Sequence, residues 1–202
     1  MRTALVGLLL APLALLGLVG PADAHEPEVS PATQVTADGH AAPGWQVHRE
    51  KEGTATCSDA AVSAVDDGIL SCYPSALYLP SCWPSAHHTV LCLRDATAKE
   101  LVRVRYRGAL ADATAPDQPS PQALTLAGGQ RCTLRVGGAW GTIPHHRSWL
   151  GFYSCAHGSL YGPPNGDGIR RTDAAWRVHL VRADNSVVRR SVRTAYVIGT
   201  AA

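Results

Sequence analysis

The chain contains very little of several residue types. Among its 202 residues there is one phenylalanine, Phe152, and one methionine, Met1. Its only lysines are Lys51 and Lys99. A hydrophobic core must therefore be built mostly from Val, Leu, Ala, Trp and Tyr, and such a core is modest. We expect covalent cross-links to contribute to the stability of the fold.

Several catalytic and metal-binding motifs are missing as well. No G-x-S-x-G motif occurs, and nothing resembles the nucleophile loop of a chymotrypsin-like triad, which argues against a serine hydrolase. No C-x-x-C motif occurs, so the close cysteine pairs of a structural zinc site are absent from the sequence. No acidic residue lies in an apolar strand that would raise its pKa, as the general acid of a glycosidase requires. We therefore predict no cofactor.

The start of the chain has the pattern of a secretory signal peptide. One positive charge at Arg2 precedes an apolar run over residues 4–20, and small residues follow up to Ala24. This order predicts a signal peptide over residues 1–24 and a mature chain that starts at His25. A membrane anchor is the alternative, but the run contains Pro12 and lacks a positively charged flank after it. We expect a secreted or envelope-associated protein with no membrane span after cleavage.

Six cysteines lie in the mature part of the chain. An even number of cysteines in an exported protein is typical of a disulfide framework, because oxidising compartments let the bridges persist. The sequence does not decide among the pairings, but bridges between neighbours in the chain would each span one short hairpin or loop. We favour these pairs, each of which contributes about 3 kcal/mol in the chain-entropy model. They are Cys57 with Cys72, Cys82 with Cys92, and Cys132 with Cys155.

The chain is expected to form one domain after a tail. Residues 25–44 are rich in Pro, Ala, Gly and polar residues and have no apolar period. We therefore predict a flexible N-terminal tail over residues 25–44 and a single β-rich domain over residues 45–202. A short helix over residues 58–68, capped by Ser58 and ended by Gly68, is the one helical element that the pattern favours.

The rest of the domain carries strand and hairpin signals. Residues 101–107 alternate strictly, with Val102, Val104 and Tyr106 on one face and arginines on the other. Short apolar runs over residues 69–73 and 89–94 predict further strands. Hairpins are expected about residues 128–129, 157–158 and 184–185. We predict an all-β fold, or a β-rich fold with one short helix, in the form of a small disulfide-stapled antiparallel domain.

Several segments resemble the C-terminal half of secreted actinobacterial proteins of the mycobacterial type. They are CTLRVGGAWG at residues 132–141, GFYSC at 151–155, GPPNGDGIRRTDAAWRV at 162–178 and TAYVIGTA at 194–201. No activity is established for that family, so the resemblance assigns no functional residue. It implies a bridge between Cys132 and Cys155 and a location in the envelope or outside the cell. The chain departs from the family pattern at residues 145–147, where it has His-His-Arg.

Charge is distributed unevenly along the mature chain. Residues 25–130 contain seven basic and twelve acidic residues, a balance of −5, whereas residues 131–202 contain ten arginines and three aspartates, a balance of +7. Such polarity can steer an acidic partner toward the C-terminal half. Arginines on solvated strand faces are the alternative explanation, and the sequence leaves both open.

The last predicted hairpin offers a candidate binding face. Strand alternation turns Trp176 inward and several arginines toward solvent. We do not expect nucleic acid as a partner, because the aromatic residues do not interleave with the arginines on one face. An acidic envelope polymer or another secreted protein is the expected partner. The candidate face consists of Arg177, Arg189, Arg190 and Arg193.

A secreted enzyme with a site assembled from loops is the alternative to a binding module. Adjacent histidines in an extended segment point to opposite faces, so a pair of neighbouring histidines offers only one inward ligand to a metal. Aspartates in a glycine-rich loop usually close turns through hydrogen bonds to the backbone. The polar residues that such an enzyme would use are His145, His146, His157, Asp167 and Asp173.

His25 suggests one further metal hypothesis. At a mature N-terminus, its amino group and imidazole would together chelate copper. The Glu-Pro-Glu sequence that follows predicts a flexible segment, which would not hold such a site in place. We therefore favour a non-enzymatic extracellular or envelope-associated binding module.

Overall fold

The computed structural model describes residues 26–74, 78–96, 98–172 and 174–201, with the backbone but not the side chains of residues 50–52. These residues form strands and no helix, which confirms the predicted all-β fold. The strands are β1 (Glu28–Thr36), β2 (Gln46–Ala60), β3 (Leu70–Pro74), β4 (Leu79–Ser85), β5 (Thr89–Asp95), β6 (Glu100–Tyr106), β7 (Ala123–Leu126), β8 (Arg131–Leu134), β9 (Leu150–Cys155), β10 (Gly158–Gly162), β11 (Arg170–Thr172), β12 (Ala175–Val181) and β13 (Val187–Ala201).

Strands β2 to β6 form a closed sheet, which we call the N-terminal barrel. Neighbours in the sequence pair antiparallel, and a parallel pairing of β2 with β6 closes the barrel. The predicted alternation of β6 is confirmed, because Val102 and Val104 are buried in the interior whereas Arg105 is exposed. The sequence did not predict that the barrel closes, since β2 and β6, the two strands that close it, are the first and the last of its five strands.

Strands β7, β8, β9, β10, β12 and β13 form the second closed sheet, the C-terminal barrel. All its pairings are antiparallel, and the pairing of β12 with β13 completes the ring. Leu124, Tyr153 and Leu160 are fully buried in its interior. The predicted hairpins are confirmed as β7–β8, β9–β10 and β12–β13. Strand β11 extends the sheet beyond β12.

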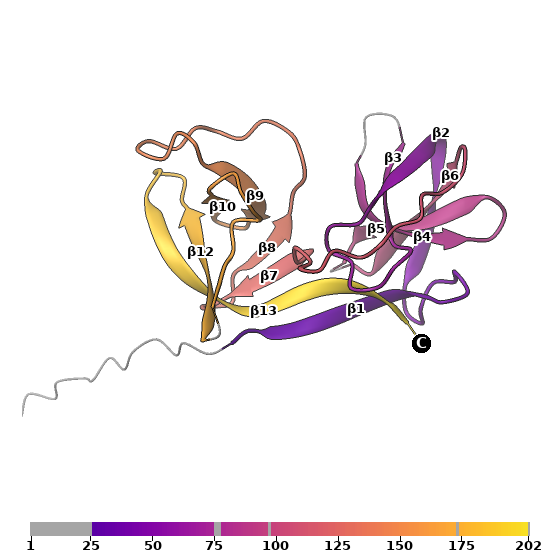
Figure 1. Ribbon diagram of the computed structural model, residues 1–202, viewed down its shortest axis with the longest axis horizontal. Helices are drawn as coiled ribbons and strands as arrows, with labels where there is room; N and C mark the ends of the chain where they lie inside the picture. The colour runs from indigo at the N-terminus through magenta and orange to yellow at the C-terminus, as the bar shows by residue number, and fades with distance from the viewer. Residues whose placement is uncertain (1–25, 75–77, 97, 173, 202) are drawn as a thin grey trace, which may run out of the picture.

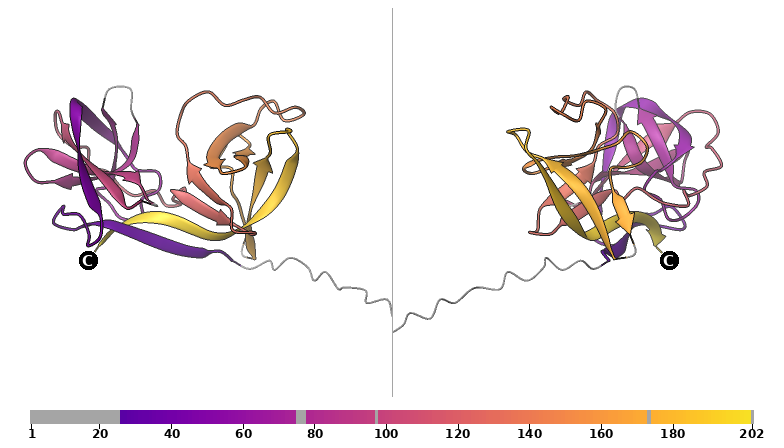
Figure 2. Two further views of the ribbon diagram at one scale, coloured as in Figure 1. Left: turned by 180° about the vertical axis from the view of Figure 1, so that it is seen from behind. Right: turned by 60° about the vertical axis from the view of Figure 1, so that its left-hand side comes forward.

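Strands β1 and β13 form a ribbon that runs past both barrels (Figure 1), and the view from behind agrees (Figure 2). β1 pairs in parallel with the second part of β13, from Glu28 opposite Thr194 to Thr36 beside Ala201. Val35 of β1 and Ile198 of β13 are buried in a cluster that also contains residues of the N-terminal barrel. The ribbon therefore joins the last strand of the C-terminal barrel to the N-terminal barrel.

The prediction of a flexible tail over residues 25–44 is wrong for residues 28–36, which form β1. Most side chains of β1 are polar or small, and the strand contains Pro31, which is tolerated because β1 is an edge strand. Its pairing rests on backbone hydrogen bonds to β13, and hydrophobic periodicity does not record such bonds. The strands that were assigned to a single domain form two closed sheets.

The predicted helix over residues 58–68 is also wrong. Its first residues end β2, and the remainder forms turns. Two carboxylates fix these turns to distant segments, since Asp67 accepts a hydrogen bond from the Ala115 amide (2.7 Å) and Asp66 accepts one from the Thr200 amide (2.7 Å). These tertiary hydrogen bonds override the weak helix propensity of the segment.

In the described part of the chain, no helix has the length and the apolar character needed to cross a membrane.

Candidate functional site

Three adjacent strands of the C-terminal half, β11, β12 and β13, carry six arginines and no acidic residue. Residues that lie directly opposite each other in an antiparallel pair share a face of the sheet. Arg170 lies opposite Arg177, and His179 lies opposite Arg189. Val178, which alternates with these residues, is buried inside the barrel. Arg170, Arg177, His179 and Arg189 therefore occupy the outer side of the sheet, and we call them the basic face.

The structure changes the composition of the predicted face. Arg190 lies opposite the buried Val178, so its side chain starts from the inner side of the sheet and is half-buried. We therefore leave Arg190 out of the basic face. Arg193 is exposed as predicted, at an irregularity in the pairing of β13 with β7. Arg170 and His179 were missed, because it takes the pairing of β11 with β12 to place Arg170 beside Arg177, and the pairing of β12 with β13 to place His179 beside Arg189.

Aromatic rings border the basic face. The ring of Trp149 stacks on that of His146 with centroids 3.9 Å apart, and it also contacts the ring of His179 at 4.7 Å. The segment that carries Trp149 is anchored to the outside of the barrel, because Ile143 packs against Tyr161 in a separate buried cluster. Imidazole and indole rings thus form a continuous surface beside the arginines.

Burial and neighbouring positive charges together lower the pKa of the histidine on this face. Burial lowers the pKa of His179 below its usual value of 6.5, and the charges of Arg189, His146 and Arg170 lower it further. His179 is therefore neutral at pH 7. A bound anion would offset these charges and raise the pKa of His179, so that binding would take up a proton.

The histidines considered for an enzyme site are not brought together in the described structure. His146 stacks on Trp149, whereas His145 and His157 are exposed in turns. Among the described residues, no hydrogen bond or ion pair joins one of these histidines to Asp167.

Asp167 has a structural partner instead. Its carboxylate accepts hydrogen bonds from the Arg171 guanidinium (Nη1 to Oδ1, 2.9 Å) and from the Ile169 amide (3.1 Å). Both side chains of the Asp167–Arg171 ion pair are largely buried. The contact closes the loop before β11, as expected for an aspartate in a glycine-rich turn. Asp173 lies outside the described residues, as does His25.

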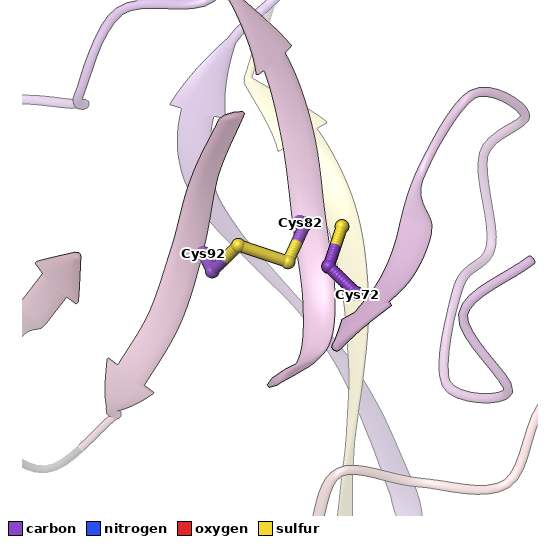
Figure 3. A group of neighbouring side chains, drawn as sticks. All are labelled: Cys72, Cys82 and Cys92. Carbon is purple, nitrogen blue, oxygen red and sulfur yellow. A yellow bond between two sulfur atoms is a disulfide. The ribbon is translucent and has the colours of Figure 1, made fainter. Parts of the chain in front are cut away.

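The six cysteines form three disulfides with the predicted pairing: Cys57–Cys72, Cys82–Cys92 and Cys132–Cys155. The sulfur atoms of Cys72, Cys82 and Cys92 lie within 4.8 Å of one another inside the N-terminal barrel (Figure 3). Three thiolates at such distances would suit zinc. Each of these sulfurs is already bonded to another sulfur, so the group is a pair of adjacent disulfides.

A cleft of about 1070 Å³ lies between the two barrels and the β1–β13 ribbon. The described candidates for an enzyme site, His145, His146, His157 and Asp167, are not among its lining residues. Its walls include Gln34 of β1, Trp45, Arg131 of β8 and Tyr196 of β13. Sequence reasoning missed this site, because its residues come from segments far apart in the chain that no local motif connects.

In comparisons with known proteins, no family model, no curated protein and no solved structure matches this chain.

Proposed function

We propose that the protein is a secreted or envelope-associated binding module without catalytic activity, and that it attaches to an acidic polymer through the basic face. The observation that carries the proposal is that Arg170, Arg177 and Arg189 of the basic face lie on three adjacent strands that lack Asp and Glu. The predicted signal peptide and the three disulfides support a location outside the cytoplasm.

The chemistry of the face suits a polyanion. Neither Arg170 nor Arg189 forms an ion pair with a described residue, so both guanidinium groups can receive carboxylate, sulfate or phosphate oxygens. Arg177 donates a hydrogen bond to the Ser191 hydroxyl (3.3 Å), which orients its side chain along the sheet. Because the face is a strand surface with spaced charges, it fits a repeating acidic chain better than a small ligand.

Replacing two arginines of the face is expected to weaken retention on a polyanion. Heparin-agarose serves as the probe, and we expect the double variant Arg177→Ser/Arg189→Ser to elute at clearly lower salt than the parent protein. Exposed charges act over a Debye length of about 8 Å at physiological salt, so retention must itself be salt-dependent. The matched control is Arg105→Ser/Arg107→Ser, which removes the same charge from exposed positions of the N-terminal half. Equal elution of both variants would contradict the proposal.

Retention should also depend on pH. Protonation of His179 adds a charge to the face, so we expect retention to strengthen as the pH falls from 7.5 to 5.5. Arg189, His146 and Arg170 are the neighbouring groups whose charges act on His179. The variant His179→Gln should therefore lose part of the pH dependence but keep its retention at pH 7.5. A parent protein whose elution salt does not change between these pH values would refute the role of His179.

A further inference from the structure

We infer that the cleft between the two barrels is a binding site for a small anionic amphiphile, a molecule with an apolar body and one negatively charged head. This site is separate from the basic face, and neither depends on the other. The cleft measures about 1070 Å³. That volume is about the upper end of the range for small-molecule sites, which commonly lie between domains.

The walls of the cleft provide an apolar surface that remains accessible. Trp45, Tyr78 and Tyr196 line it from three separate segments, and all three side chains are half-buried. Leu134 of β8 and Pro80 of β4 continue this surface and are also half-buried. Aromatic and aliphatic walls of this kind hold the apolar body of a ligand.

Most of the charged side chains that line the cleft are positive. Arg49, Arg94 and Arg131 line the cleft, whereas Asp95 is the one carboxylate among its described lining residues. Arg94 is paired with Glu100 (3.6 Å), but neither Arg49 nor Arg131 forms an ion pair with a described residue. Two guanidinium groups at an apolar cleft favour a ligand with an anionic head.

The buried amide of Gln34 gives independent support for a polar ligand. Gln34 lines the cleft from β1 and its side chain is fully buried, yet neither its amide nitrogen nor its oxygen has a hydrogen-bond partner among the described residues. Buried polar groups are almost always paired, and an unpaired one destabilises a fold. A ligand head that reached Gln34 would provide the missing donor or acceptor.

The test uses a fluorescent pair of probes on the full mature chain. We expect 1-anilinonaphthalene-8-sulfonate, an aromatic anion, to bind with enhanced fluorescence, and its uncharged relative N-phenyl-1-naphthylamine to bind more weakly. The variants Arg131→Ala and Arg49→Ala should each weaken binding of the sulfonate about tenfold, as expected for the loss of one charge-assisted contact. The control Arg105→Ala removes an exposed arginine that does not line the cleft and should leave the affinity unchanged.

Competition then identifies the head group. Dodecanoate and dodecyl phosphate, used below their micelle concentrations, should displace the sulfonate, whereas dodecanol should not. The stronger of the two anions defines the head as carboxylate or phosphate. Displacement by dodecanol as effective as that by the anions would overturn the inference, and so would equal affinities for the parent protein and Arg131→Ala.

The variant Gln34→Leu distinguishes a binding role of Gln34 from a purely structural one, because we expect it to change stability and probe affinity in opposite directions. Removing an unpaired buried amide should raise the thermal unfolding midpoint, whereas the loss of the polar contact should weaken the affinity for the anionic probe about tenfold. An unchanged affinity in Gln34→Leu would overturn the role of Gln34. Heparin retention tests the basic face and not the cleft. Failure of the anionic probe to bind the cleft would therefore not contradict the proposed function of the basic face.

Discussion

A chain that lacks residues 26–44 is expected to be much less stable than a chain that retains them. Val35 is fully buried against the N-terminal barrel, and β1 contributes the whole outer edge of the ribbon with β13. The following turn is also engaged, because the Ser85 hydroxyl donates a hydrogen bond to the Gly39 carbonyl (2.7 Å). Losing one buried aliphatic side chain costs about 2 kcal/mol, and the truncation adds lost backbone pairing. We expect the thermal midpoint to fall by about 10 °C or more.

Two point variants within β1 test whether a buried side chain of the strand contributes more to the thermal midpoint than an exposed one. Val35→Ala should lower the thermal midpoint by about 5 °C, since it leaves a cavity in a packed cluster. Val29→Ala is the matched control, because Val29 lies in the same strand but is 45% exposed, and its midpoint should stay close to that of the parent. A truncated chain with the parent midpoint would mean that residues 26–44 are the flexible tail that composition alone suggested.

Replacing Cys57 alone is expected to scramble the disulfides of the N-terminal barrel. The variant Cys57→Ala leaves Cys72 as a thiol whose sulfur lies within 4.8 Å of both sulfurs of the Cys82–Cys92 bridge. Its thiolate can attack that bridge, form a new bond to one sulfur and release the other as a thiol, with no net oxidation. Peptide mapping after alkylation, without reduction, should find Cys72 bonded to Cys82 or Cys92 in part of the protein.

The double variant Cys57→Ala/Cys72→Ala serves as the control for exchange. It lacks the attacking thiol, so its Cys82–Cys92 bridge should remain homogeneous. Both variants lose the constraint of the Cys57–Cys72 bridge, which corresponds to about 3 kcal/mol in the chain-entropy model. Their thermal midpoints should therefore fall by about 10 °C. If alkylation labels only Cys72 in the single variant, exchange between the neighbouring bridges does not occur.

The parts of the fold that were predicted correctly depend on short-range signals. The hairpin about residues 128–129 is marked by two glycines, and β6 is marked by the alternation of Val102 and Val104. The disulfide pairing followed the same logic, because each bridge joins neighbouring strands of one hairpin or sheet. Local periodicity and turn chemistry are readable without knowledge of the rest of the chain.

The parts that were missed depend on contacts between distant segments. β1 has little apolar character and is held by β13, and the two barrels close through strands that periodicity cannot pair. The cleft could not be foreseen for the same reason, since Gln34 and Arg131 come to line one cleft only when both barrels and the ribbon have formed. At the basic face, alternation alone did not decide which of Arg189 and Arg190 points outward, because that requires the register with β12.

The parallel pairing of β1 with β13 also sets an order of events during folding. β1 is synthesised near the start of the chain, yet its partner residues from Thr194 to Ala201 are made at the end of this sequence. The cluster that contains Val35 is incomplete until Ile198 has been synthesised. The outer surface of the N-terminal barrel is therefore covered only after β13 has been made. Contacts so distant in sequence slow folding, because a long loop must close before they form. A nascent chain would therefore remain incompletely folded until these residues of β13 have been synthesised.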